Sequence, residues 1–446
     1  MGLDRHVLIG TIVWAFACAG RPAFAQEPLT LSQAVGAALA ANPAIAARQA
    51  ALQEAEQQLP EARAAYFPRV DFAQSWQRGT HPVFVFGSLL SQRQFSEADF
   101  AVSQLNNPPP LTNSRSAFSL EQVVFDGGRT AAAVSSASMA ASTARVAERQ
   151  TRNDLALAAT RAYGQVLRTA AERRAAASAV TAAEEDVRTA EARRDAGTGT
   201  EADVLSIRVH LAQMRARVIE AESGERVASV ELNRLMNTPL DREWSLLEPA
   251  IVEGAEEEMS VLIANAMQHR PEIEQAAIRH DVGRALQRTA RSALLPNIAL
   301  QAGYEWNDGA RASPAGAWIA GASMHVNLFS GGANLARLRA ASYGIARAEA
   351  ERQELEASVR VEVMTAMEHL RAARARQDVG RAAAMQARES HRMIRDRYEA
   401  GIAPAADVIR AATAVLDAEA QNIGALIDVV VGAAALRKAA GQEVHP

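Results

Sequence analysis

Residues able to do catalytic or metal chemistry are few and scattered in this sequence. The nine histidines show no repeated ligand spacing, and none pairs with a cysteine. The one cysteine, Cys18, falls in an N-terminal segment that we expect to be removed. We find no combination of nucleophile, base and orienting acid. The sequence therefore predicts a protein that is not an enzyme and that holds no metal ion or other cofactor.

Two glycine pairs could suggest a phosphate site. Neither is followed by the Lys-Ser/Thr that a phosphate-binding loop needs. Each pair instead ends a predicted strand and precedes a long predicted helix. Because glycine tolerates backbone conformations closed to other residues, we expect these residues to be swivels between strand and helix. They are Gly127, Gly128, Gly331 and Gly332.

Two aspartates recur at equivalent places in the chain. Asp203 and Asp407 each open a predicted helix just after a turn, 204 residues apart (407 − 203). The structural interpretation is that an acidic residue in the first turn interacts favourably with the helix dipole. A functional interpretation follows if copies of the chain surround an axis, because the aspartates would then form acidic rings of the kind found in cation-conducting pores. Both interpretations stay open.

Composition excludes one class of partner and favours helices. The 446 residues carry a formal net charge of −4, so the chain lacks the basic excess of a nucleic-acid-binding protein. Aromatic residues make up only 5% of the chain, and alanine dominates the apolar residues. Alanine is the best helix former, so we expect long helices that pack closely.

Residues 1–25 have the features of a secretory signal peptide. Arg5 precedes an apolar run from Val7 to Cys18, and Ala23-Phe24-Ala25 is a cleavage site of the small-x-small type. The mature chain should begin at Gln26, although lipidation of Cys18 after a different cleavage stays open. The apolar run is shorter than the roughly 20 residues that a membrane-spanning helix needs. We expect no later segment to be long enough either.

The chain contains an internal duplication. Pro43 is echoed by Pro271 and Pro68 by Pro296, both at a spacing of 228 (271 − 43 and 296 − 68). Further on, Phe-Asp-Gly-Gly at 125–128 and Phe-Ser-Gly-Gly at 329–332 lie 204 apart (329 − 125). The difference places a 24-residue excess (228 − 204) in the first copy. We expect this excess to be a loop between Gly79 and Asn113, rich in proline and asparagine.

Each copy predicts the same series of elements. Helices come first, with Thr30 and Gln33 spaced as a capping box, and two strands of alternating apolar and polar residues follow. The first repeat covers 26–240, with strands at about 69–78 and 115–125. A linker covers 241–258. The second repeat covers 259–446, with strands at about 297–306 and 317–329.

A long helix without proline follows each glycine pair, at about 129–195 and 333–399. Some 65 residues at about 1.5 Å each extend about 100 Å. Each helix turns at a glycine-containing tip and returns as a shorter helix. On the first return helix the apolar residues are spaced 3, 4, 3, 4, as in a coiled-coil seam; they are Val204, Ile207, Leu211, Met214 and Val218. We therefore expect paired helices that project from the strands.

Four strands with one apolar face cannot close a barrel alone, because the smallest membrane barrels need about eight. A dimer would supply 2 × 4 = 8 strands, and side chains about fill the interior of a barrel of that size. A trimer would supply 3 × 4 = 12 strands and leave a lumen. The pattern favours a trimer. The long helices would then form a hollow cylinder, with the tips farthest from the membrane.

In this order of elements the sequence resembles the TolC-like outer membrane factors. The resemblance rests on the duplicated strand pairs, on Phe-x-Gly-Gly at both strand exits, and on the tip sequence from Arg397 to Gly401 leading to Asp407-Val408-Ile409. It implies a mainly α chain with a small β part. It further implies a homotrimeric 12-stranded β-barrel in outer-membrane lipid, a periplasmic α-helical barrel, and docking to a periplasmic adaptor and an inner-membrane pump. The expected function is the exit duct of an efflux or type I secretion system.

The resemblance also assigns roles at the tips. Relatives carry constricting aspartates in the stretch matching Asp407, but Arg410 stands where some have a second aspartate. Tyr398 matches a tyrosine that helps to hold the closed state, whereas the position of its arginine partner is Ala403 here. A lock would have to be built from other residues, for which the candidates are Arg193, Arg194 and Arg397. Gly197 and Gly401 mark the expected adaptor-docking tips.

Two rival interpretations remain at this stage. A periplasmic coiled-coil scaffold or adaptor without a pore would explain the helices but not the two-faced strands. An exported enzyme would need a catalytic cluster that the sequence does not display. The transported substrate and the pump family are not encoded in any motif that we recognise.

Overall fold

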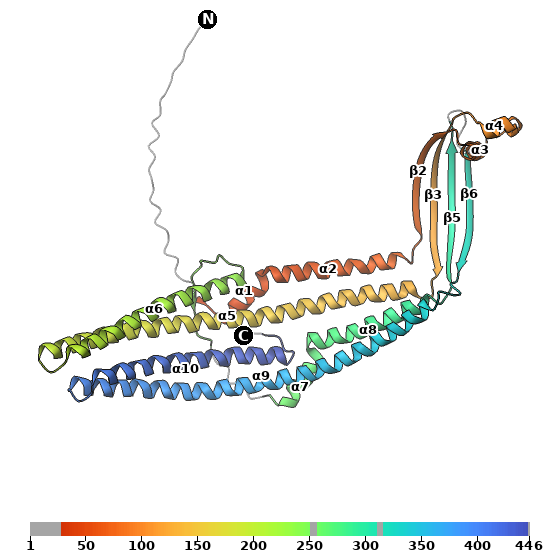
Figure 1. The fold of residues 1–446 in the computed structure, drawn as a ribbon. Helices are drawn as coiled ribbons and strands as arrows, with labels where there is room; N and C mark the ends of the chain where they lie inside the picture. The colour runs from red at the N-terminus through yellow and green to blue at the C-terminus, as the bar shows by residue number, and fades with distance from the viewer. Residues whose placement is uncertain (1–27, 250–256, 310–314, 445–446) are drawn as a thin grey trace, which may run out of the picture.

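The computed structural model describes residues 28–249, 257–309 and 315–444. The expected signal peptide, the start at Gln26 and Cys18 lie outside these residues, as does part of the expected linker. The described chain is a long layer of helices with a four-stranded sheet at one end (Figure 1). Two-residue strands β1 (Pro28–Leu29) and β4 (Ser245–Leu246) pair in parallel beside the helices.

The duplication is present in the structure. Helices α2 (Pro43–Ala64) and α8 (Pro271–Ser292) both have 22 residues and both begin at a proline. Helices α5 (Arg129–Asp195) and α9 (Ala333–Glu399) both have 67 residues and lack proline. Short helices α1 (Leu31–Ala41) and α7 (Met259–His269) precede α2 and α8. The capping box expected at Thr30 is formed, because Gln33 N donates to Thr30 Oγ1 at 3.2 Å.

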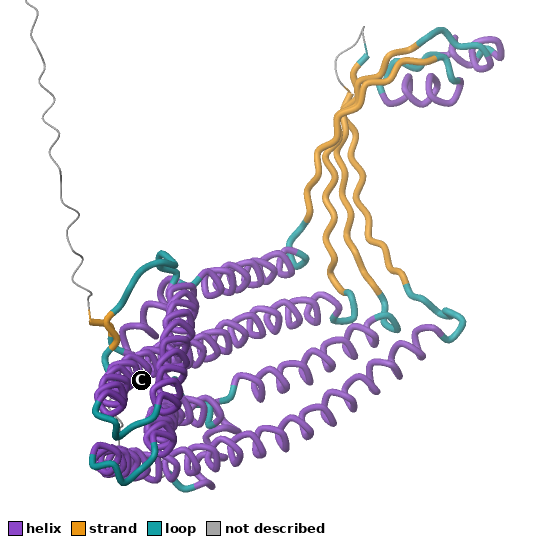
Figure 2. The backbone as a smooth tube through the Cα atoms, turned by 60° about the vertical axis from the view of Figure 1, so that its left-hand side comes forward, coloured by secondary structure: helices purple, strands orange, loops and turns teal. Residues whose placement is uncertain are grey.

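Each long helix pairs with the helix that follows its tip. Helix α6 (Glu201–Met236) runs back along α5, and α10 (Ala405–Ala439) runs back along α9. Helices α5 and α10 also lie side by side, so the two hairpins form one layer (Figures 1 and 2). At about 1.5 Å per residue, α5 and α9 each extend about 100 Å.

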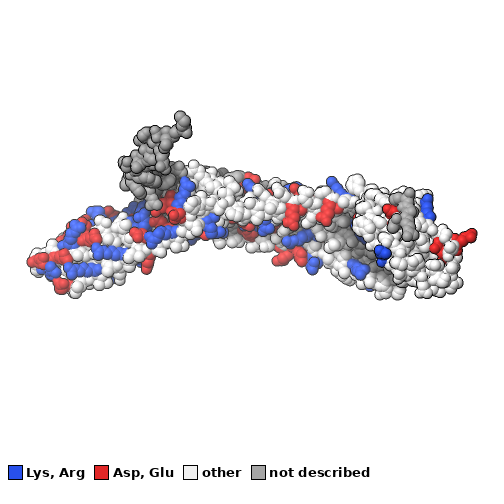
Figure 3. Space-filling model, turned by 90° about the horizontal axis from the view of Figure 1, so that it is seen from above, with Lys and Arg blue, Asp and Glu red and all other residues white. Residues whose placement is uncertain are grey.

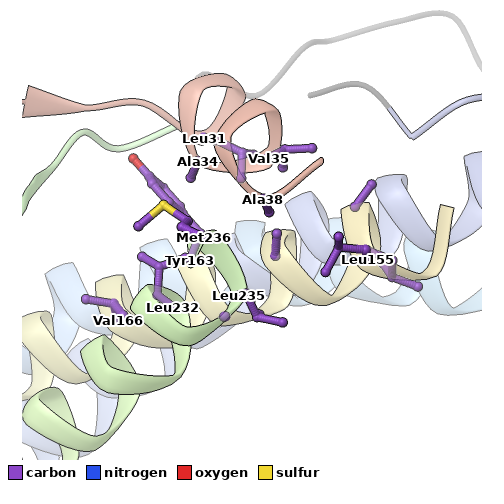
Figure 4. Close-up of a cluster of buried hydrophobic side chains, with 14 of the residues drawn as sticks. Leu31, Ala34, Val35, Ala38, Leu155, Tyr163, Val166, Leu232, Leu235 and Met236 are labelled. Carbon is purple, nitrogen blue, oxygen red and sulfur yellow. The ribbon is translucent and has the colours of Figure 1, made fainter. Parts of the chain in front are cut away.

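The main hydrophobic core lies near the middle of the layer, where α1 covers α5 and the end of α6 (Figure 4). Tyr163 of α5 is buried beside Leu232 and Met236 of α6. Its hydroxyl lies 2.7 Å from the carbonyl oxygen of Leu29, the last residue of β1, and 2.7 Å from that of Leu247, which follows β4. Burial raises the pKa of this phenol to about 12. The core therefore fastens the β1–β4 pair to the long helices.

Four strands form an antiparallel sheet in the order β2–β3–β5–β6. They are β2 (Arg69–Gly79), β3 (Leu111–Phe125), β5 (Asn297–Asp308) and β6 (Ala315–His325). Within the described residues β2 and β6 are the edges, and neither has a second partner strand. The mainly α fold with four strands in two repeats is thus confirmed.

The excess in the first copy is not the simple loop that we expected. Residues 80–110 contain helix α3 (Pro82–Ser91), a 3-10 turn at Glu97–Phe100 and helix α4 (Val102–Asn106). This outer insert sits at the end of the sheet farthest from the helices (Figure 2). Pro82 at the first position of α3 was a signal for a helix, because the fixed φ of proline suits the first turn of a helix.

We expected no segment after the signal peptide to be long and apolar enough to cross a membrane, and by length and composition this was wrong. Helix α10 contains an 18-residue window apolar enough to cross a membrane. The same helix packs along α9 and α5, and its apolar side chains join the cores between these helices. Its apolar character is therefore explained by packing within the helical layer. Charged residues gather on the hairpin end of the layer, whereas the sheet end is mostly uncharged (Figure 3).

Candidate functional site

The sheet has one apolar and one polar face. The register aligns Phe72, Phe118, Tyr304 and Trp318 in one row across all four strands. Trp76 and Trp318 on this face are 73% and 78% exposed. Side chains of this size are seldom left in water in a continuous patch. The apolar face therefore suits lipid, as the alternation along the strands predicted.

The opposite face carries charged and amide side chains. Arg115 of β3 and Glu305 of β5 form an ion pair across the sheet, and Arg69 pairs with Asp71 at 2.9 Å along β2. Adjacent positions on this face include Glu121 opposite Gln301. These groups keep their hydrogen-bonding capacity only in water or with each other. This face suits an aqueous lumen.

A pair of glycines lies at each junction between a strand and the long helix that follows it. Gly127 and Gly128 have φ of +66° and +88°, and Gly331 and Gly332 have φ of +63° and +85°. In the first copy Asp126 accepts hydrogen bonds from the backbone of Gly128 at 2.9 Å and of Thr130 at 2.6 Å. The left-handed backbone is accessible to glycine at little cost. The glycine pairs therefore let the chain turn from strand into helix at both junctions, and their role as swivels stays a prediction.

The two hairpin tips meet at the far end of the layer. Gly197 and Gly401 have φ of +75° and +79°, and each accommodates the turn after a long helix. Beneath the turns lies a small apolar cluster drawn from all four helices. Its buried members are Ala190, Val204, Ile207, Tyr398, Ala405 and Val408. The tips are therefore held together by packing as well as by polar contacts.

Arg193 of the first hairpin reaches Tyr398 of the second. Its guanidinium donates to the carbonyl oxygens of Tyr398 and Glu399, the latter at 3.3 Å, and its carbon Cζ lies 4.9 Å from the centre of the Tyr398 ring. It also donates to Thr198 O at 3.1 Å in its own tip. Burial raises the pKa of Tyr398, and Arg193 partly opposes this shift. Two of the four residues proposed for a lock are thus in contact.

The other two arginines lie elsewhere. Arg194 forms ion pairs with Asp195 at 2.7 Å and Glu201 at 3.2 Å, both within its own hairpin. Arg397 is exposed, and its carbonyl oxygen accepts from Ile402 N at 2.9 Å in the turn. Neither arginine side chain takes part in the Arg193–Tyr398 contact.

The two aspartates at the tips have different partners. Asp203 completes a capping box with Thr200, whose hydroxyl lies 2.7 Å from the carboxylate. Asp407 forms an ion pair with Arg410 one turn further along α10. The structural interpretation of Asp203 therefore has direct support. A ring of three Asp407 carboxylates would be weakened by the three arginines beside them.

A buried polar layer below the tips was not predicted. Asp186 of α5 lies 3.7 Å from Arg395 of α9, and His210 of α6 is buried at 4% exposure. Burial raises the pKa of Asp186 and lowers the pKa values of His210 and His391. The seam prediction chose Leu211, whereas the structure buries His210 and leaves Leu211 half-buried. The 3, 4 spacing of Ile207, His210 and Met214 could have revealed this.

No cluster of three or more His, Cys, Asp or Glu residues that could hold a metal ion occurs in the described part of the chain. The polar groups of the sheet and the tips are instead distributed along a surface. Such an arrangement can line a passage, but it does not converge on a reacting atom.

A protein-family profile described as "Outer membrane efflux protein" matches residues 34–238 and 262–442. No curated protein sequence matches the chain. Solved structures that share its fold include the outer membrane protein VceC from Vibrio cholerae, with a TM-score of 0.77 and 20% identity over 93% of this chain and 96% of that one. A membrane protein from Pseudomonas aeruginosa has a TM-score of 0.80 and 19% identity over 92% of this chain and 90% of that one. The CmeC outer membrane channel from Campylobacter jejuni has a TM-score of 0.78 and 16% identity over 92% of this chain and 85% of that one.

Proposed function

The chain belongs to the outer membrane efflux protein family, and from this premise we propose that three copies close into one channel that works with a periplasmic adaptor and an inner-membrane pump. The protein lies in the outer membrane, extends into the periplasm and serves as the exit duct of an efflux system. Its family is one of transport proteins, and the proposal includes no catalytic step. The scaffold interpretation is set aside, because it leaves the two-faced sheet without a purpose.

The observation that carries the proposal is the sheet with two unpaired edges. Strands β2 and β6 present free backbone groups within the described chain, and in a bilayer such groups must be paired. Pairing β6 of one copy with β2 of the next satisfies both edges. Three copies give 3 × 4 = 12 strands, which leave an aqueous lumen. The polar face would line that lumen and the apolar face would meet lipid.

The same symmetry gathers the helical layers into a tunnel. The hairpin tips would lie at its periplasmic mouth, about 100 Å from the sheet by helix length. The exposed turns at Gly197 and Gly401 are the proposed docking surface for the adaptor. Arg193 and Tyr398 are the proposed lock of the closed state, while Arg194 and Arg397 remain weaker candidates because neither side chain joins the two hairpins.

Reconstitution tests the channel itself. Liposomes containing the purified protein should admit oligosaccharides that empty liposomes exclude, and planar bilayers should show discrete conductance steps. A protein that inserts into neither membrane would remove the proposed function. Heat-denatured protein at the same concentration is the control for leakage caused by detergent.

The acidic-ring hypothesis needs its own variants. The double variant Asp203→Asn and Asp407→Asn should lower the preference for cations, and Arg410→Ala alone should raise it, because the arginine no longer neutralises Asp407. Asparagine keeps the shape of the Asp203 capping group. Unchanged ion selectivity in both variants would leave the structural interpretation of the two aspartates as the correct one.

A further inference from the structure

The outer insert, residues 80–110, is a folded unit present once per chain. It joins β2 to β3, whereas only residues 309–314 separate β5 from β6 in the second copy. The ring of Phe95 packs edge-on against Phe86 at 4.9 Å and Phe100 at 5.0 Å between centroids. Val85 of α3 is buried, at 3% exposure. The insert is therefore held partly by aromatic contacts among its own residues.

A chain of buried amides fastens the insert to the sheet. Gln92 Nε2 donates to Asn113 Oδ1 at 2.8 Å, and Asn113 Nδ2 donates to Asn307 Oδ1 at 2.9 Å. All three side chains are buried, at the outer end of a sheet whose other side chains are mostly exposed. Leaving a buried amide unpaired costs about 1–3 kcal/mol. The connection therefore holds the insert in one place.

Two of these amides, Asn113 of β3 and Asn307 of β5, belong to the polar face of the sheet. Asn113 is two residues from Arg115, and Asn307 is two residues from Glu305, so all four side chains lie on one face. That face lines the lumen in the proposed trimer. The insert is thus attached on the lumen side of the outer mouth, and the lipid side of the sheet remains uncovered.

The insert exposes large apolar side chains. Val83, Phe100 and Val102 are 75%, 64% and 72% exposed in the single chain. In the proposed trimer β2 pairs with β6 of the next copy, so the insert that follows β2 begins at the joint between two copies. The exposed apolar side chains of the insert are therefore close enough to contact the neighbouring copy in the proposed trimer.

We propose that the outer inserts of three copies meet around the channel axis and narrow its external mouth. The proposal rests on the trimeric channel proposed above. The occupant of the exposed apolar surface is a second copy of this chain. The external mouth then has a barrier independent of the tips, and a solute leaving the duct must pass both.

Access of reagents to the lumen from outside the cell tests this proposal. Cys18 is the only cysteine of the sequence and lies in the expected signal peptide, so Ser119→Cys places a single thiol on the polar face in mid-sheet. Its labelling rate is measured on whole cells with a small maleimide and with one carrying a long polyethylene glycol chain. Replacing residues 80–110 by Asn-Gly should raise the ratio of large to small labelling rates by about tenfold or more.

A point variant and a matched control separate the effect of the outer insert from that of the sheet. Asn113→Ala should raise the same ratio, because it breaks the amide chain that holds the insert. Gln77→Ala removes an exposed amide from the opposite position on β2 and should leave the ratio unchanged. A trimer that conducts ions but shows the same ratio with and without the insert would overturn the inference alone. A monomer would overturn the proposed function and the inference together.

Discussion

Replacing Arg193 by alanine should favour the open state of the periplasmic tips. The Arg193 side chain joins the two hairpins of one subunit at the tips, through the carbonyl oxygens of Tyr398 and Glu399. The variant removes these hydrogen bonds and the contact with the Tyr398 ring. The ion pair between Arg395 and Asp186 also joins the hairpins, and the variant leaves it in place. The apolar cluster below the tips is left intact, so the hairpins should still fold.

The magnitude follows from these contacts. A hydrogen bond from a charged donor contributes about 1.5 kcal/mol. A guanidinium over an aromatic ring contributes about 0.5 kcal/mol at the lower end of its range. Their sum of about 2 kcal/mol corresponds to a shift of about 30-fold in the equilibrium between closed and open tips of one subunit. The second hydrogen bond, to the carbonyl oxygen of Glu399, is long at 3.3 Å and adds little to this sum.

Single-channel recording in planar bilayers measures this shift as the fraction of time spent in the high-conductance state. Tyr398→Phe is the matched control, because it keeps the ring and the carbonyl oxygen that Arg193 uses and removes only the hydroxyl. That control should behave nearly as the unmodified protein does. Equal open fractions for Arg193→Ala and the unmodified protein, with intact trimers in both, would refute the assignment of Arg193 to the lock.

Three further predictions concern the junction, the buried layer and the lipid face. Gly127→Ala should destabilise the trimer more than Gly331→Ala in thermal unfolding. Both variants place alanine in a left-handed backbone conformation, which costs about 1–2 kcal/mol, but only the first places its Cβ 2.8 Å from Leu295 Cβ. Equal decreases in thermal stability would contradict this reasoning. Burial lowers the folded-state pKa of His210 below its unfolded value. The free energy of unfolding should therefore be highest above about pH 6.5 and should fall on acidification by at most about 1.4 kcal/mol per pH unit. His210→Leu should reduce this dependence on pH. Trp318→Lys should abolish membrane assembly at a cost of about 2–4 kcal/mol, whereas Ala317→Lys on the opposite face should assemble; equal yields of membrane-inserted protein would contradict the assignment of faces.

The repeated local signals made much of the fold predictable from sequence. Proline at the start of α2 and α8 and glycine pairs at the ends of the strands bound the elements, and the long helices lie at 129–195 and 333–399 as expected. Such signals depend on the backbone conformation of one or two residues. They need no knowledge of the rest of the molecule.

Contacts between distant segments were not predictable in this way. Arg193 and Tyr398 are 205 residues apart (398 − 193), and only the side-by-side packing of the hairpins brings them into contact. The lock proposed for these two residues therefore had no local signal in the sequence. The folded outer insert was missed for a similar reason. Its helix α3 is stabilised by packing within the insert and by amides on β3 and β5, and its prolines alone indicated a loop.

The most direct test of the account is the mass of the protein extracted from outer membranes in mild detergent, measured by native mass spectrometry. We expect a complex of three chains that also survives unheated electrophoresis in dodecyl sulfate, because each free strand edge is then paired with a neighbouring copy. A monodisperse single chain, soluble without detergent, would contradict the closed sheet and with it the channel.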